Sequence, residues 1–240
     1  MKTLKKLVWT LGLLVSGIAM QSCNDNDGNY YQPTALVTVH PMSDGTFVMH
    51  LDDSTVLYPT NIKSSPFGEK EVRALVNYAY SDESKNPQNV FVHWIDSIRT
   101  KMPVPSIDEE HDKMYGNDPI EIVKDWVTVA EDGYLTLRIR TRWGISGTTH
   151  LINLLTGTNP ENPYELELRH NAQGDTDGKM GDALIAFNLN GLKTAGESDI
   201  RIKLNWESFS GKKNIEFDLR LRPTAELHDS ESITFNKRVE

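Results

Sequence analysis

The chain has 240 residues, of which 38% are hydrophobic and 25% are charged, and its formal net charge is −9. These values are typical of a globular protein and exclude a disordered or fibrous chain, and the length suffices for one large or two small domains. An acidic protein repels a phosphate backbone, so nucleic acid is not an expected partner.

Residues 1–22 have the pattern of a bacterial export signal. Lys2, Lys5 and Lys6 precede an apolar run from Leu7 to Met20. This run is shorter than the roughly 20 residues that a membrane-spanning helix needs, and it fits the hydrophobic region of a signal peptide. Removal of these residues takes away three lysines and no acid, which lowers the formal net charge to −12.

The only cysteine of the chain, Cys23, follows this signal directly. Met20, Gln21 and Ser22 before it resemble the relaxed lipoprotein box of Bacteroidetes, which implies that Cys23 becomes an N-acyl diacylglyceryl cysteine. A lone cysteine can form no internal disulfide, so the alternative is an incidental thiol in a flexible segment. Acyl chains contribute about 0.8 kcal/mol per buried methylene, and lipidation at Cys23 therefore predicts a stable membrane anchor.

Residues 23–35 are polar and rich in turn formers, as expected of a tether between lipid and fold. Asp25 and Asp27 resemble the acidic signal that accompanies surface display in Bacteroidetes lipoproteins. The expected location is therefore the cell envelope, anchored by lipid to the outer membrane, with surface display as the favoured orientation.

The first part of the mature chain, 36–102, alternates apolar and polar residues with a period of two, which indicates strands. Turn formers separate five such runs, at 35–42, 46–51, 55–59, 71–80 and 90–100. Five short strands have edges to protect, and closure into a small barrel protects them.

Residues 103–117 contain two prolines and an acidic cluster without alternation, and we expect a linker there. Alternation returns in residues 118–225, for example in Leu135–Trp143, where apolar and polar side chains take opposite faces. Strands of this kind pack on one face only, so we predict an antiparallel β-sandwich as the second domain. We expect residues 226–240 to be a C-terminal tail.

Several segments together resemble the NigD-like lipoproteins of Bacteroidales. They are HLDDSTVLYPTN, EVRALVNYAY, GNDPIEIVKDW, THLINLL and YELELRHNAQGD, and with the lipoprotein box they cover nearly the whole mature chain. The resemblance implies an all-β protein with an N-terminal five-stranded OB-type barrel and a C-terminal β-sandwich. It implies no catalytic residues, because no activity is established for the family.

Aromatic residues of the barrel strands are the first candidates for ligand binding. OB barrels bind oligosaccharides or oligonucleotides on one sheet face, and an acidic protein outside the cytoplasm favours sugar. The candidate rings are Tyr58, Tyr78, Tyr80 and Trp94. Because Tyr78 and Tyr80 alternate in phase with apolar residues, the competing interpretation is that such rings fill the barrel core.

Polar candidates lie in the second domain. Arg169, His170 and Asn171 end a predicted strand and either line a polar pocket or make interdomain hydrogen bonds. Asp175, Asp177 and Asp182 are spaced for a loose calcium site, although an EF-type loop is excluded because Lys179 and Ala186 occupy ligand positions. The alternative is a solvated turn. We expect no catalytic residue and no cofactor.

These observations favour a non-enzymatic, lipid-anchored envelope protein that binds or presents a glycan, a peptide or an envelope-protein partner. Two other hypotheses stay open. One is an immunity lipoprotein that blocks a bacteriocin or another toxin. The other is a polysaccharide hydrolase, which needs two carboxylates roughly 5–10 Å apart across a cleft.

Overall fold

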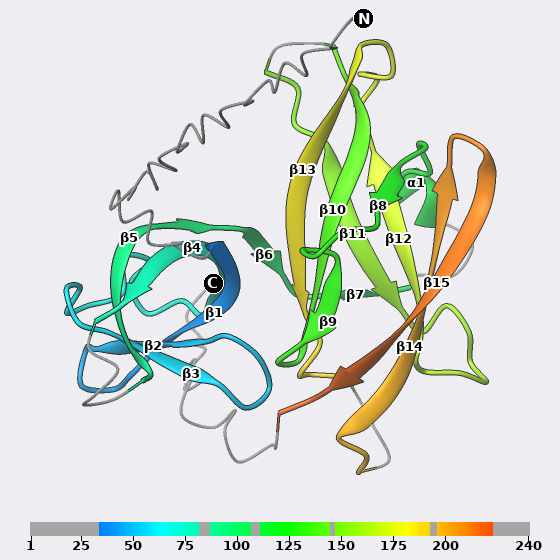
Figure 1. The fold of residues 1–240 in the computed structure, drawn as a ribbon. Coiled ribbons are helices and arrows are strands. Elements are labelled where there is room, and N and C mark those ends of the chain that lie inside the picture. The colour runs from blue at the N-terminus through cyan, green and yellow to red at the C-terminus, as the bar shows by residue number, and fades with distance from the viewer. Residues whose placement is uncertain (1–33, 82–86, 107–110, 145–146, 193–195, 223–240) are drawn as a thin grey trace, which may run out of the picture. The chain divides into compact units, whose positions relative to one another are not determined.

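The computed structural model describes residues 34–81, 87–106, 111–144, 147–192 and 196–222. The expected lipidation site Cys23, the export signal and the C-terminal tail lie outside these ranges. None of the helices within them has the length and apolarity needed to span a membrane. Figure 1 shows the strands in chain order.

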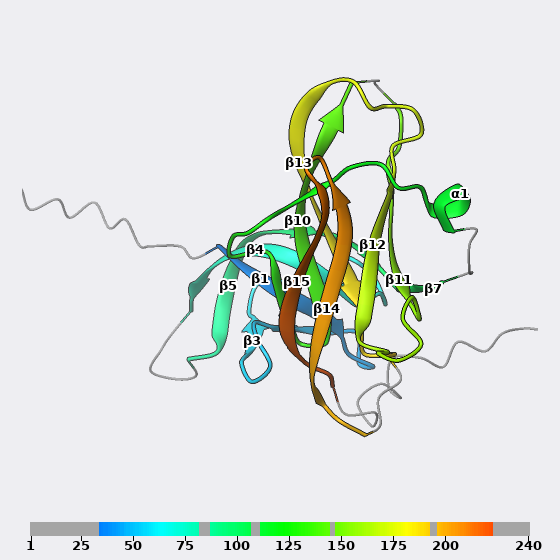
Figure 2. The same ribbon diagram turned by 90° about the vertical axis from the view of Figure 1, so that its right-hand side faces the viewer.

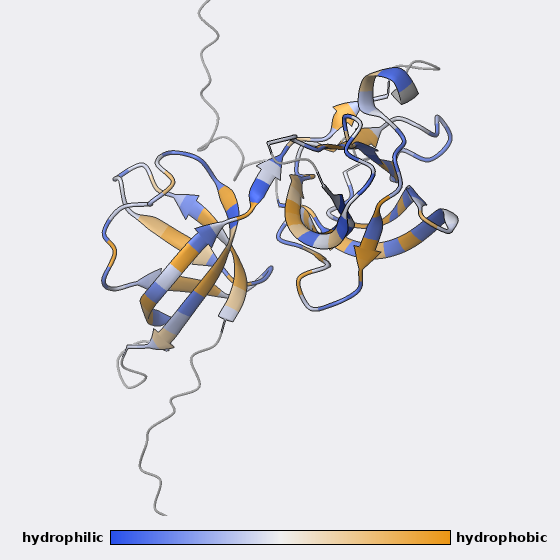
Figure 3. Cartoon of the chain, turned by 90° about the horizontal axis from the view of Figure 1, so that it is seen from above, coloured by the Kyte–Doolittle hydropathy of each residue, from blue (hydrophilic) through white to orange (hydrophobic). Residues whose placement is uncertain are grey.

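The N-terminal part forms a closed five-stranded barrel. Its strands follow the order β1-β2-β3-β5-β4, with β1 at Thr34–Pro41, β2 at Phe47–His50, β3 at Val56–Pro59, β4 at Val72–Tyr80 and β5 at Asn89–Ser97. Alternate residues of these strands fill the interior, among them Val37, Met49 and Leu57. Figure 3 shows this alternation as hydrophobic and hydrophilic residues along the strands.

The remaining elements begin with two short strands and a short helix, β6 at Arg99–Lys101, β7 at Val104–Pro105 and α1 at His111–Tyr115. Eight strands follow, β8 at Glu121–Val123, β9 at Val129–Glu131, β10 at Tyr134–Trp143, β11 at Leu151–Thr156, β12 at Glu165–Asn171, β13 at Lys179–Asn188, β14 at Asp199–Ser208 and β15 at Gly211–Arg220.

These strands build two sheets with the apolar core of the second domain between them. One sheet has the order β6-β13-β10-β8, with β9 also paired to β10, and the other has the order β15-β14-β12-β11-β7. Strands β15, β14, β12 and β11 can be followed across the second sheet in Figure 2. The expected all-β fold, a closed five-stranded barrel followed by a β-sandwich, is confirmed.

Three strand pairs in the sandwich are parallel, so its sheets are mixed. Strands β12 and β14 run parallel because β13, which lies between them in the chain, belongs to the other sheet. Strands β6 and β7 add to the sheet edges in parallel with β13 and β11. Periodicity indicates which residues form strands but not their direction, and these pairings were therefore not expected.

The expected linker and the end of the fifth predicted strand contribute to the sandwich. The run 90–100 divides at Ile98, because β5 stays in the barrel whereas β6 pairs with β13. Within residues 103–117, β7 pairs with β11 at Val104 and Leu155. The connection between the two domains is therefore tied into both sheets of the sandwich.

A two-residue turn joins β9 to β10 at Asp132 and Gly133. Both residues have positive φ, 51° and 73°, as a type I′ hairpin turn requires. A Cβ on Gly133 would lie 1.9 Å from the side chain of Asn190, so only glycine fits. The turn thereby fixes the position of Asp132, whose carboxylate bonds to Arg222.

Candidate binding surface

Four aromatic rings are exposed on three neighbouring strands of the barrel. These residues, which we call the barrel rings, are Tyr58 on β3, Tyr80 on β4, and Phe91 and Trp94 on β5, and they are between 42% and 47% exposed. The strands are adjacent because β5 lies between β3 and β4. Large exposed rings are common in binding sites because they offer contact area at a low cost in conformational entropy.

A β-bulge explains why Phe91 and Trp94 are both exposed. Residues three apart on a regular strand point to opposite faces, but the pairing of β4 with β5 shifts register here. Asn77 lies opposite Trp94 and Tyr78 lies opposite Val92, so His93 is the extra residue. The bulge turns both rings outward, as bulges do where a side chain must be redirected.

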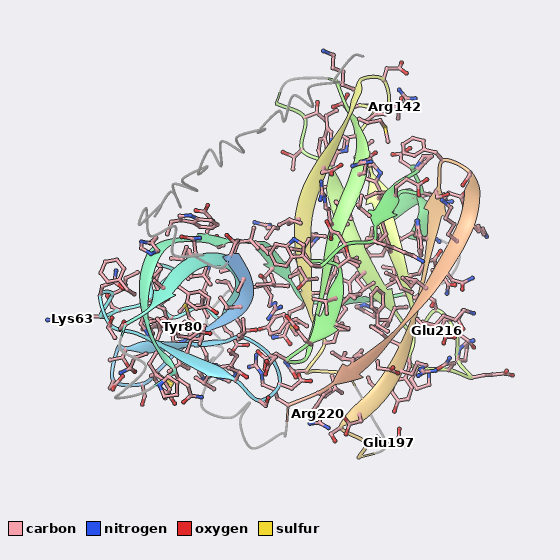
Figure 4. The ribbon with its side chains drawn as sticks, in the orientation of Figure 1. Lys63, Tyr80, Arg142, Glu197, Glu216 and Arg220 are labelled. Carbon is pink, nitrogen blue, oxygen red and sulfur yellow. The ribbon has the colours of Figure 1, made fainter. Side chains whose placement is uncertain are left out.

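Tyr78 and Tyr80 share a phase on β4 but differ in exposure. Tyr78 is 3% exposed and belongs to the barrel core, whereas Tyr80 is 47% exposed at the end of the strand. Their rings meet edge to face with centroids 5.5 Å apart. Figure 4 labels Tyr80 on the barrel. Of the four predicted rings, the structure thus places Tyr58, Tyr80 and Trp94 where a ligand could reach them.

A small groove lies on the outer side of the first sandwich sheet, where it meets β4. Its volume is about 240 Å³, and it is lined by Leu75, Asp125, Trp126, Val127, Arg138, Asp182, Ala183 and Leu184. Trp126 is 59% exposed, more than any of the barrel rings. This residue stands in the KDW end of a segment that carries the family resemblance, but its exposure was not predicted.

The predicted polar cluster of the second domain is mostly buried. Arg169 and His170 are 6% and 1% exposed, and Arg169 lies 3.1 Å from Glu167 in an ion pair. The side chain of Asn171 accepts a hydrogen bond from the backbone of Gln173. That these three residues line a binding pocket remains a prediction. The hydrogen bonds and the ion pair described for them lie within the second domain.

His170 belongs to a chain of buried groups that joins distant parts of the sequence. Its Nδ1 lies 3.3 Å from the carbonyl oxygen of Pro119, which can only accept. His150 lies 2.9 Å from His170 and 3.3 Å from Asp175, and its ring packs against Trp143 in a tilted arrangement with centroids 4.2 Å apart. Burial lowers the pKa of His170, and the neighbouring His150 lowers it further.

The three aspartates considered for calcium have different surroundings. Asp175 is buried and accepts hydrogen bonds from the backbone of Gly144, whereas Asp177 is exposed. Asp182 pairs with Arg138 and Arg140 instead. Within the described residues, no group of three or more histidine, cysteine, aspartate or glutamate side chains could hold a metal ion.

Charged residues form a second buried network where the barrel contacts the sandwich. Arg73 of β4 is fully buried. Its guanidinium donates to Thr38 at 2.8 Å and to Thr136 at 3.3 Å, and it pairs with Glu131. Thr136 stands on the face of β10 that was expected to be polar and exposed, and it is buried because Arg73 binds it.

Arg222 completes this network from the far end of the sandwich. It donates two hydrogen bonds of 2.8 Å to the carboxylate of Asp132 and two more to Glu71 of the barrel. Glu71 also accepts from His40 and from the hydroxyl of Tyr134. Each buried charge of this group therefore faces an opposite charge or a donor, as stable burial requires.

The electrostatics of Glu71 follow from these contacts. Burial alone would raise the pKa of Glu71, but the hydrogen bond from His40 and the charge of Arg222 outweigh burial and lower the pKa to about 2. The same kind of balance lowers the pKa of Asp132, where His50 and Arg222 oppose burial. Both carboxylates are therefore ionised at neutral pH.

Sequence reasoning missed Phe91, Trp126 and the Arg222 network. The signal for Phe91 was present, because it alternates with the core residues Val90 and Val92. No local signal marks the network, because Arg222 and Glu71 are 151 residues apart.

Two family models match the chain. The NigD-like N-terminal OB domain matches residues 36–98, and the NigD-like C-terminal beta sandwich domain matches residues 103–219. No curated protein matches the chain.

Solved structures share the fold. A protein from Parabacteroides distasonis, described as toxin related, is 29% identical, with a TM-score of 0.68 over 83% of this chain and 99% of that one. A Bacteroides vulgatus protein of unknown function is 18% identical, with a TM-score of 0.61 over 80% and 92%. A NigD-like immunity protein from Bacteroides caccae is 21% identical, with a TM-score of 0.55 over 77% and 91%. With both domains matched in order, the chain belongs to the NigD-like family.

Proposed function

We propose that this chain is a non-enzymatic lipoprotein of the outer membrane, anchored through lipid on Cys23, that binds a glycan, a peptide or an envelope-protein partner through the barrel rings. The observation that carries the binding role is the outward turn of Phe91 and Trp94 at the bulge of β5. A ring that served only the core would point into the barrel, as Tyr78 does. The lipoprotein box at Cys23 supports the location.

Lipid labelling tests the anchor. Cells that express the full-length protein receive a labelled fatty acid, and a Cys23→Ala variant is compared with a Ser22→Ala variant, which keeps the thiol. We expect label and membrane association in the parent and in Ser22→Ala, and neither in Cys23→Ala. A parent without label, or Cys23→Ala retained equally in the membrane fraction, contradicts the anchor.

Capture from intact envelopes tests the binding role. The tagged protein is compared with a Phe91→Ala/Trp94→Ala variant and with Phe209→Ala, which removes an exposed ring from the sandwich. A specific partner that the double variant loses and the Phe209→Ala variant keeps supports the proposal. Equal recovery by all three proteins would contradict a role for the barrel rings.

Toxin immunity is the second candidate, because a 29% identical solved structure is described as toxin related. It predicts that deletion of the gene makes cells more sensitive to a toxin of neighbouring bacteria. Hydrolysis, the third hypothesis, predicts new reducing ends when the protein is incubated with envelope polysaccharides.

A further inference from the structure

The turn that carries Trp126 is held by hydrogen bonds on both sides. The Asp125 carboxylate accepts from the backbone of Val127 at 3.2 Å and from Arg138 at 2.7 Å. The hydroxyl of Thr128 donates to the carbonyl of Val123 at 2.6 Å and accepts from the backbone of Arg138 at 3.1 Å. The turn is therefore fixed to β8 and β10, and a fixed site loses little entropy on binding.

The groove beside Trp126 combines an apolar floor with a charged rim. Leu75, Val127 and Leu184 supply apolar side chains. On the rim, Arg138 bridges Asp125 and Asp182, and Asp182 also pairs with Arg140. Two arginines and two aspartates therefore compensate one another, and an ionic ligand would meet no uncompensated charge.

The size and chemistry of the groove fit one ring of a sugar. Its volume of about 240 Å³ lies below the roughly 300–1,000 Å³ of sites for drug-sized ligands. A pyranose has apolar C–H faces that stack on an indole and hydroxyl groups at its edge. Asp125 and Arg138 at the rim offer the planar acceptors and donors that such hydroxyls bind.

We propose that the Trp126 groove binds a single pyranose ring of a neutral glycan, stacked on the indole and hydrogen-bonded by Asp125 and Arg138. The acidic character of the chain, with a net charge of −9, favours a neutral over an anionic polymer. This inference rests on the proposed binding function and adds a second site with a stated ligand class. Leu75, which lines the groove, belongs to β4. Asn77 of the same strand lies opposite Trp94, one of the barrel rings.

Indole NMR tests the proposal. The full-length protein is purified in a zwitterionic detergent that has no sugar headgroup, with ¹⁵N in its tryptophans. It is titrated with maltohexaose, cellohexaose and mannohexaose, and with hexagalacturonate as the anionic comparison. We expect at least one neutral hexasaccharide to shift the indole N–H signal of Trp126, and we expect hexagalacturonate to bind less tightly.

Three variants test whether the sugar binds at Trp126. Trp126→Ala should weaken binding by about tenfold or more, the loss of a hot-spot residue. Trp126→Phe, which keeps a ring, should retain most of the affinity, and Phe209→Ala should retain all of it. Urea unfolding checks that Trp126→Ala stays folded, as the exposure of its ring predicts.

The proposal is contradicted if no neutral hexasaccharide binds, if Trp126→Ala binds as well as the parent, or if hexagalacturonate binds equally well. A groove occupied instead by a polypeptide, seen as a Trp126-dependent protein partner without sugar binding, also contradicts it. The proposed function is tested separately by the Phe91→Ala/Trp94→Ala variant, whose envelope capture depends on neither Trp126 nor the hexasaccharides.

Discussion

Arg222 donates hydrogen bonds of 2.8 and 2.9 Å to the two carboxylate oxygens of Glu71, which lies 151 residues earlier in the chain. The same guanidinium binds Asp132 in the turn between β9 and β10. One side chain thus joins the end of the sandwich to the barrel.

Substitution of Arg222 by methionine should lower the free energy of unfolding by about 3–5 kcal/mol, because Glu71 and Asp132 would then be buried without their cation. The matched control is Arg201→Ala, which removes an exposed pair with Asp218 and should lower the free energy of unfolding far less, because solvent screens exposed ion pairs. Urea denaturation measures both. Equal effects would show that the buried contact contributes no more than a surface pair.

The low pKa of Glu71 makes stability depend on acid. Its pKa in the fold is about 2, below the value of about 4.3 of an unfolded chain. The stabilisation is therefore complete above about pH 4.3 and is lost as the pH falls toward 2. Glu71→Gln should flatten this part of the curve of unfolding free energy against pH. Parallel curves for the two proteins would contradict the assigned contacts.

From the buried His170 we expect a second dependence of stability on pH, in a higher pH range than that of Glu71. Because burial lowers its pKa in the fold, the unfolded chain takes up a proton first as the pH falls below about 6.5. Stability should therefore be complete above this pH and decrease below it. The His170→Gln variant should lose less stability between about pH 7.5 and 5.5 than the parent. An identical loss in both proteins would assign the effect to other histidines.

Tyr58 and Tyr78 should respond differently to truncation. Tyr78→Ala empties a place in the barrel core and should cost about 3–5 kcal/mol, whereas Tyr58→Ala on the outer face should cost less than about 1 kcal/mol. Thermal unfolding followed by circular dichroism measures the difference. If Tyr58→Ala destabilises as much as Tyr78→Ala, then Tyr58 serves the core and not a ligand.

Local sequence patterns predicted the elements of this fold well. The period of two located the barrel strands, whereas the hairpin turn at Asp132 and Gly133, with positive φ at both positions, is a finding of the structure. The same patterns could not separate Tyr78 from Tyr80, because their exposure depends on where β4 ends and not on its phase.

Local sequence patterns could not predict the contacts between segments that are distant in the chain. The sequence predicts that Thr136 is an exposed polar residue. In the structure, Arg73 of the barrel donates a hydrogen bond to Thr136 and covers it. His150 directly precedes β11, and Asp175 lies in the loop after β12. The two side chains meet only because the fold brings these two segments together. The bulge that exposes both Phe91 and Trp94 arises from the pairing of β5 with β4, which sequence alone does not specify.

Photo-crosslinking in living cells measures directly whether the barrel rings contact a partner. A photoreactive phenylalanine analogue replaces Trp94 on the barrel or, as the comparison, Phe209 on the sandwich, and the cells are irradiated. Binding through the barrel rings predicts a discrete crosslinked envelope partner, glycan or protein, from position 94 and none from position 209. Crosslinks of equal yield and pattern at both positions, or none at position 94, would contradict binding through the barrel rings.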